Sequence, residues 1–355
     1  MQIRNPFVMN CGVFTTSYRQ DMAFHFTPLA HLRVMIIVAL LFLFPFMVNE
    51  YVVSVANLVG IAVIGALGLN ILTGFTGQIS IGHGAFLGVG AYTSAILTTK
   101  LGLSFWIALP LAGIVTALVG SIFGIPSLRL KGLYLAIATL AAQVIIEFTI
   151  IHWTSLTNGT RGMILPAPQL AGYSLDSDRS YYFLILVLAL LATVFAFNLF
   201  RTRPGRAFVA IRDRDIAAEV IGIDLFKYKI MAFALSSFYA GIAGSLWAHY
   251  LTIISPEHFT ISVSIEYLAM IIIGGLGSVM GSIYGALFMT LLPVLLRTLA
   301  EALSSIFPDI ESVFLGLREA VFGATIILFL IFEPEGIAKI WKNIKDYFHL
   351  WPFSY

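Results

Sequence analysis

The chain is built from long runs of apolar residues separated by short polar stretches. A transmembrane helix needs about 20 mostly apolar residues, and the runs predict ten such helices. Two of them, 84–99 and 262–275, are short and border glycine-rich stretches. The ten predicted segments are 34–53, 54–71, 84–99, 104–125, 133–151, 181–200, 230–252, 262–275, 279–297 and 313–332. The pattern therefore predicts an all-α fold, a polytopic transmembrane helical bundle.

The composition also indicates a membrane protein. Hydrophobic residues make up 59% of the 355 residues and charged residues 11%, whereas soluble proteins have about 45–50% and about 25%. This balance excludes an ordinary soluble enzyme and a disordered chain. The net charge of +2 is too small for a nucleic-acid-binding surface. The single cysteine, Cys11, excludes a disulfide framework.

The distribution of lysine and arginine predicts the orientation, because short cytoplasmic loops carry an excess of both. If the N-terminus is inside and ten spans alternate, the inner segments hold 15 of the 20 cations, and the five others are Lys100, Arg161, Arg179, Arg297 and Arg318. We therefore expect a cytoplasmic N-terminal segment (1–33), a transmembrane domain (34–332) and a cytoplasmic tail (333–355). Within that domain, 201–229 is expected to be an inner loop and 152–180 an outer loop.

A glycine-rich stretch interrupts the apolar pattern after the second predicted span. Its glycines are too dense for one regular helix, since each costs about 1 kcal/mol relative to alanine. Polar groups at membrane depth are tolerated only inside protein or beside a water-filled cavity. The stretch is either a broken helix that lines a translocation path or a tight cytoplasmic turn. The candidate path residues are Asn70, Thr73, Gly74, Gly77, Gln78, Ser80, Gly82, His83 and Gly84.

A second glycine-rich stretch, which contains Gly274, Gly275 and Gly277, follows the short span 262–275. Short, glycine-interrupted segments at matching places in two halves of a chain point to a binding or gating site. An internal repeat is therefore one hypothesis. Close helix packing through small residues spaced four apart, such as Gly277 and Gly281, is the other.

His83 also has two interpretations. A histidine near neutral pKa could act as a proton switch, but a lone histidine between two glycines is more typical of a packed, hydrogen-bonded residue. On the predicted span 279–297, Arg297 lies four residues before Glu301, which is the spacing of an ion pair on one helix face.

The basic inner loop 201–229 contains an amphipathic pattern among mixed charges. Its apolar stripe, which has a gap at Asp215, consists of Phe208, Ile211, Ile216, Val220 and Ile221. Such a helix could lie on the membrane surface. It could equally dock in a groove of a cytoplasmic partner. The residues by themselves leave both interpretations open.

Several motifs in one order resemble a known family. The run LNILTGFTGQISIGHGAFLGVGAY at 69–92 is similar to the signature of LivM- and LivH-type permease subunits of bacterial branched-chain amino acid ABC importers. Segments 126–140, 158–163, 204–207 and 332–336 resemble the LivM branch, so the resemblance covers about residues 50–340. It implies that Asn158, Thr160 and Arg161 lie at the outer mouth, near the binding protein.

The resemblance also implies a docking helix for an ATPase. Importer permeases carry a cytoplasmic motif of the form Glu-Ala-Ala-x-x-x-Gly, and residues 216–222 match its Ala-Ala-x-x-x-Gly core. Ile216 replaces the leading glutamate, so a contact made by that carboxylate is absent here. The implied coupling residues are Arg206, Ile216, Ala217, Ala218, Glu219 and Gly222.

The implied partners are a second, LivH-type permease, two cytoplasmic ATPases, a periplasmic binding protein and the lipid of the inner membrane. We expect no catalytic residue, metal site or bound cofactor in this chain, because no GxxxxGK[ST] phosphate loop and no metal-spaced cluster occurs in the sequence. ATP would be used by the partner chains.

Three alternatives stay open. The same architecture could import urea or another small amide or acid. An ion-coupled secondary transporter would also suit broken helices, but it would need a carboxylate near the membrane midplane, and the acids cluster at segment ends. A passive channel would need a recognisable selectivity motif.

Overall fold

The structure, a computed structural model, describes residues 28–128, 130, 132–170, 173–303 and 310–350. Most of the expected N-terminal segment 1–33, and the last five residues of the expected tail, therefore lie outside the described residues. So do Arg129 and Lys131, two of the cations that were counted as cytoplasmic.

Ten long helices overlap the ten predicted spans within the described residues, which confirms the all-α bundle. They are α2 (Pro28–Met47), α3 (Glu50–Asn70), α4 (His83–Thr99), α5 (Phe105–Gly124), α6 (Leu133–His152), α8 (Asp178–Arg201), α10 (Leu225–Leu251), α11 (Ile261–Gly274), α12 (Val279–Leu303) and α13 (Ile310–Phe332). The predicted boundary between the first two spans is wrong by several residues, because α3 already begins at Glu50, whose negative charge suits a helix N-terminus.

Length and composition alone support fewer membrane crossings than the ten that the sequence predicts. Seven of the described helices are long and apolar enough to cross a membrane, or eight if the bent pair formed by α13 and α14 (Ile337–Leu350) counts as one span. The helix α4 has 17 residues and the apolar part of α2 runs over Leu32–Met47. Ten spans therefore stay a prediction.

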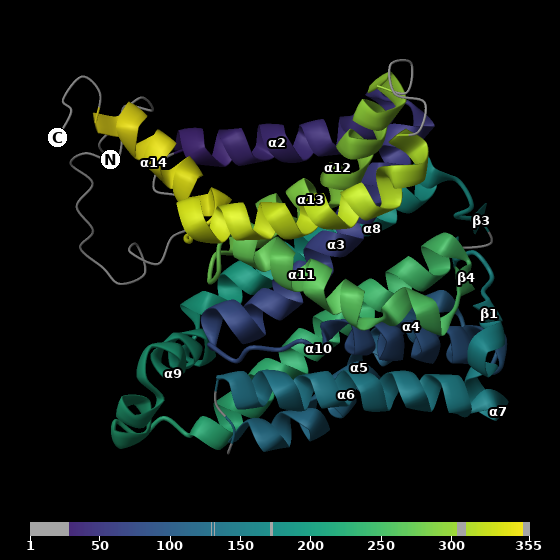
Figure 1. Cartoon of the computed structure of the whole chain (residues 1–355). Coiled ribbons are helices and arrows are strands. Elements are labelled where there is room, and N and C mark those ends of the chain that lie inside the picture. Colours follow the sequence, from purple (N-terminus) through teal and green to yellow (C-terminus); the bar gives the residue numbers. More distant parts are fainter. Residues whose placement is uncertain (1–27, 129, 131, 171–172, 304–309, 351–355) are drawn as a thin grey trace.

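The remaining elements gather at the two ends of the bundle (Figure 1). The helix α9 (Arg203–Val220) and α14 lie at one end, which we call the α9 end. At the opposite end lie α7 (Thr154–Thr157), η3 (Gly159–Arg161) and the antiparallel pair β1 (Met163–Ile164) and β4 (Ile253–Ile254). The other short elements are η1 (Ile71–Phe75), η2 (Ile125–Leu128), β2 (Gln169–Leu170), β3 (Tyr173–Ser174) and η4 (Pro256–Phe259).

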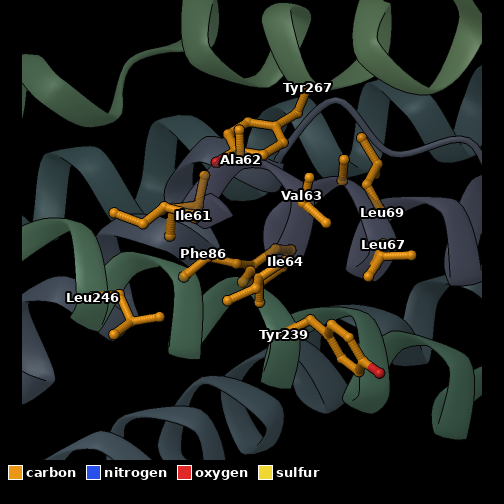
Figure 2. Packing of buried hydrophobic residues seen from close by; sticks show 14 of the residues in the cluster. Ile61, Ala62, Val63, Ile64, Leu67, Leu69, Phe86, Tyr239, Leu246 and Tyr267 are labelled. Atoms are coloured by element: carbon orange, nitrogen blue, oxygen red, sulfur yellow. The ribbon is translucent and has the colours of Figure 1, made fainter. Parts of the chain in front are cut away.

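The core forms around α3, which is buried along most of its length. Figure 2 shows Ile61, Ile64 and Leu67 of α3 packed with Phe86 of α4 and Leu246 of α10. Lipid is as apolar as these side chains, so close packing rather than exclusion from water holds such helices together. The expected small-residue packing of the second glycine-rich stretch is found at Gly285, which lies against the Met270 carbonyl of α11.

An ion pair that the sequence predicts also forms on α12. The Nε of Arg297 lies 2.9 Å from Oε1 of Glu301 one turn later, and both side chains are exposed. An exposed pair of this kind contributes only a few tenths of a kcal/mol, so it marks the helical spacing rather than stabilising the fold.

Candidate functional site

The first glycine-rich stretch is a real break in a helix. The helix α3 continues into η1, a five-residue π-helical turn that ends at Phe75, and α4 starts only at His83. Residues between them have no regular secondary structure but are held by hydrogen bonds. Thr73 Oγ1 donates to the Gln78 carbonyl (3.1 Å), and the Ile81 amide donates to Thr139 Oγ1 of α6 (3.0 Å). We call residues 71–82 the first break.

The polar residues predicted for this break are mostly buried. Thr73, Gln78, Ser80 and His83 are all less than 10% exposed. Buried irregular backbone is the arrangement expected beside a path through protein, and it differs from a simple surface turn.

The second stretch is a shorter break, residues 275–278, between α11 and α12. Gly277 has a φ of +73°, which side chains other than glycine rarely adopt. We call this segment the second break.

The two breaks meet, and Asn70 joins them. Its Nδ2 donates to the Ser278 carbonyl (2.8 Å) and to Ser282 Oγ (2.7 Å), and its Oδ1 accepts from the Gly277 amide (2.9 Å). Asn70 is 1% exposed. Gly74 also lies directly against the Gly277 amide. One buried side chain therefore fastens two segments that are more than 200 residues apart in the chain.

The helix α4 begins inside the bundle rather than at its edge. The His83 ring donates from Nε2 to the Gly65 carbonyl of α3 (3.0 Å). Gly65 lies ten residues before Phe75, the end of η1, which at 1.5 Å per residue is about 15 Å of helix. Figure 1 shows the first break running back from the α9 end to the middle of the bundle, where α4 starts.

His83 is accordingly a packed, hydrogen-bonded residue in this structure. It is 1% exposed, and its ring lies 5.2 Å from the ring of Tyr267 on α11. The geometry matches the structural interpretation of this histidine, and the proton-switch interpretation has no support from it.

The beginnings of α4 and α11 face each other at this depth. The Gly84 amide donates to Ser264 Oγ (2.7 Å), and the Ala85 amide donates to Oε1 of Gln143 on α6 (2.7 Å). Gln143 also donates to the Phe259 carbonyl (2.7 Å). Free amides at a helix start can bind a carboxylate, but these two already have protein acceptors. A bound carboxylate would have to displace these acceptors, Ser264 Oγ and Gln143 Oε1.

The inner loop forms α9, which bends at Arg214, where the backbone leaves helical geometry. Before the bend, Phe208 and Ile211 are buried against the bundle; after it, Ile216 is 69% and Val220 82% exposed. The sequence predicted one apolar stripe along this loop. That prediction is wrong, because the bend turns the second half of the stripe away from the chain.

The matched Ala-Ala-x-x-x-Gly core lies after the bend. Ala218 is buried, whereas Ala217 and Glu219 are exposed. Gly222 has a φ of +90°, and its amide closes the helix on the Glu219 carbonyl (2.9 Å). The segment 215–222 is therefore a short, closed helical unit with an apolar outer face. Arg206 lies before the bend and donates to the Arg201 carbonyl at the root of the loop.

One functional candidate was missed by the sequence analysis. Arg212 of α9 donates from Nη1 to the Gly74 carbonyl of the first break (3.2 Å), and its guanidinium lies against Gly277 of the second break. In the sequence Arg212 is one of seven cations in a mixed-charge loop. No local signal distinguishes Arg212, because both of its contacts are distant in the sequence. Gly74 lies 138 residues before it, and Gly277 lies downstream in the second break.

A small polar cavity of about 200 Å³ lies between the first break, the start of α6 and α9. Gln78 lines it, and the amide nitrogen and oxygen of Gln78 are buried without a hydrogen-bond partner among the described residues. Buried amides are rarely left unpaired, which distinguishes Gln78 from the other polar residues of the first break.

The predicted outer-mouth residues form an exposed turn at the opposite end. Asn158 adopts a left-handed conformation (φ +60°) between α7 and η3, and Thr160 and Arg161 are exposed. Gly162 then packs against the Ile254 carbonyl of β4, which fixes the turn to the bundle. The structure thus brings the three residues together in one turn.

Fold and site together define a multi-pass membrane permease, in which apolar helices surround buried helix breaks. The chain matches the family described as "Branched-chain amino acid transport system / permease component" over residues 51–330, and it belongs to that family. The family and the apolar helices confirm the expected location in the inner membrane of a bacterium.

Individual relatives agree with this family. The chain is 37% identical to the LivM permease protein of Escherichia coli over 269 residues, covering 68% of this chain and 63% of that protein. It is also 37% identical to LivM of Salmonella typhimurium over 258 residues, covering 66% and 61%. Similarity to the LivH permease protein of Escherichia coli is lower, 26% over 295 residues, covering 77% and 89%.

These matches confirm the resemblance to LivM-type permeases. The matched region spans somewhat less than two thirds of the length of the two LivM proteins. No solved structure matches the chain.

Proposed function

We propose that this chain is the LivM-type permease subunit of an ATP-driven importer and that it forms, with a second permease, the path for branched-chain amino acids. The observation that carries the proposal is the family match over residues 51–330, together with the 37% identity to two proteins named as branched-chain amino acid transport permeases. ATP would be hydrolysed by partner chains.

The two breaks are the proposed moving part of the path. Their backbone is buried and irregular, they contact each other through Asn70, and the cavity at Gln78 opens beside the first break. Segments of this kind can be rearranged without unfolding a long helix. The path candidates are therefore those that the sequence predicts at and beside the two breaks: Asn70, Thr73, Gly74, Gly77, Gln78, Ser80, Gly82, His83, Gly84, Gly274, Gly275 and Gly277.

The segment 215–222 is the proposed docking site for a cytoplasmic ATPase. Its outer face carries three apolar side chains, Ile216, Val220 and Ile221, each at least 69% exposed. Apolar side chains this exposed at the end of an amphipathic helix suit burial in a groove of another protein. Under this proposal the α9 end, with α14, lies in the cytoplasm, and the exposed turn at Asn158 faces the binding protein.

The proposal is tested by reconstitution. The chain would be purified with its second permease and ATPases and placed in proteoliposomes with ATP inside and the binding protein with radiolabelled leucine outside. Uptake of leucine that depends on ATP is expected. If the same complex imports urea and not leucine, the result would support the alternative substrate class, urea or another small amide or acid. Uphill uptake by this chain alone on an ion gradient would contradict the proposal.

Docking is tested separately with Val220→Asp, which puts a charge on the outer face of segment 215–222. The ATPases should no longer copurify with the permease, because a buried unpaired carboxylate costs several kcal/mol. Val220→Leu keeps the apolar face and is the matched control. Normal copurification with Val220→Asp would show that the ATPases dock elsewhere.

A further inference from the structure

The contacts of α9 with the two breaks extend the proposed function, on which the following inference rests. We infer that Arg212 is the coupling residue that connects the ATPase-docking segment to the breaks. It is a positioning residue: it would act by holding the breaks and not by touching the transported molecule.

The first step is the position of Arg212. It lies two residues before the bend at Arg214, on the last turn of the half of α9 that is packed against the bundle. Ile211, its neighbour, is 5% exposed and anchors this turn. The docking segment starts at Asp215. A displacement of that segment therefore reaches Arg212 through only two intervening residues.

The second step is what Arg212 holds. Its Nη1 donates to the Gly74 carbonyl at the end of η1, and the same guanidinium lies against Gly277. A Cβ built on Gly77 would also meet Arg212, at 3.1 Å from its Cγ. One side chain thus touches both breaks at the place where Asn70 fastens them.

The third step is the chemistry of the contact. The Gly74 carbonyl belongs to a π-helical turn, where main-chain carbonyls are easily left without a regular partner. A guanidinium is a strong donor to such a carbonyl because it is always charged. Asp213 orients the group by accepting from Nε of Arg212 (3.1 Å).

The contact is also accessible to change. The Arg212 side chain is 38% exposed, whereas Asn70 is 1% exposed. Water can replace the breaks as partner of the guanidinium, so this bond can break and reform during a transport cycle. The buried Asn70 contacts would need a larger rearrangement. Arg212 is therefore suited to transmit movement and Asn70 to hold the breaks together.

The inference is tested in the full reconstituted complex with Arg212→Ala. ATPases should copurify as with the wild type and should continue to hydrolyse ATP, while ATP-dependent leucine uptake falls about tenfold, which corresponds to about 1.4 kcal/mol of coupling. Lys227→Ala removes one exposed cation from the same loop and should import normally. Arg212→Lys, which keeps the charge and one donor, should recover part of the uptake.

Other results would overturn the inference. Normal uptake by Arg212→Ala would show that the contact carries no coupling, and parallel loss of uptake and ATPase binding would show that it only holds α9. If Arg212→Ala is not recovered from the membrane, Arg212→Gln takes its place under the same criteria. Failure of the proposed function is distinct, because then the wild-type complex itself would not import leucine.

Discussion

At the scale of single residues, the most consequential side chains are polar ones inside an apolar protein. Asn70 makes two hydrogen bonds to the second break and one to Ser282 of α12, and it supplies the acceptor for the Gly277 amide, which lipid could not supply. Nothing in the local sequence separates Asn70 from the other polar residues of the first break. Its role comes from a segment that folds against it from far along the chain.

We predict that Asn70→Ala lowers the thermal stability of the detergent-purified protein. The change leaves the Gly277 amide without its acceptor, and an unsatisfied buried group costs about 1–3 kcal/mol. Asn70→Asp keeps the acceptor for Gly277 and tests the donor side by itself. A melting midpoint of Asn70→Ala equal to that of the wild type would contradict this account.

A second residue-scale prediction concerns Gly277. Alanine there would be strained by the positive φ, at about 1–2 kcal/mol, and its Cβ would come within 2.8 Å of Arg212 Nη1. Gly102 has a similar φ of +64° but open space around it. Thermal melting should therefore show a larger loss for Gly277→Ala than for Gly102→Ala. Equal losses would mean that crowding by Arg212 is unimportant.

At the scale of elements, the decisive feature is where helices begin. The helix α4 starts within the bundle, and Gln143 of α6 connects this start to the start of α11 through its amide. The sequence predicted two short spans here, and shortness is what a helix that starts inside the bundle requires. The partner helix α6 carries no comparable signal, since Gln143 is a single polar residue in an apolar run.

We predict that Gln143→Leu destabilises the contact between α4 and α11. Gln143 is 1% exposed. Its side-chain oxygen accepts hydrogen bonds from the Ala85 amide and Ser264 Oγ, and its side-chain nitrogen donates to the Phe259 carbonyl. Hydrogen exchange at the start of α4 should become faster. Gln143→Glu keeps the acceptor for the Ala85 amide and should have a smaller effect. Unchanged exchange in Gln143→Leu would show that packing by itself fixes α4.

At the scale of the whole molecule, the bundle has two different ends. The helices α9 and α14 share one end, and the turn at Asn158 and the pair β1–β4 share the other (Figure 1). The lysine and arginine distribution predicts that the α9 end faces the cytoplasm. The arrangement is the one that ten alternating spans produce, although only seven or eight helices meet the length and hydropathy criteria for a crossing.

This orientation is predicted to appear in cysteine labelling. In a Cys11→Ser background, Ile164→Cys should react with a membrane-impermeant maleimide in intact spheroplasts, because Ile164 is 76% exposed at the outer end. Ile216→Cys should react only after lysis. Lys342→Cys on α14 should behave as Ile216→Cys does. The opposite pattern would invert the topology.

The sequence by itself determined the class of structure. Runs of apolar residues long enough to cross lipid admit only helices, since backbone polar groups need partners within their own segment. Dense glycine and polar residues then marked both breaks, because no regular membrane helix has that composition. The Ala-Ala-x-x-x-Gly core of residues 216–222 could also be recognised as a motif. The sequence did not indicate how exposed its apolar side chains are.

Tertiary structure decided how these parts act on one another. Local sequence cannot specify that Asn70 meets Gly277, that Arg212 reaches Gly74, or that Gln143 joins the starts of α4 and α11. Each of these contacts joins residues far apart in the chain, and each polar group has many local alternatives as partner. The bend at Arg214 is of the same kind, because packing of Phe208 and Ile211 on the bundle holds the first half of α9.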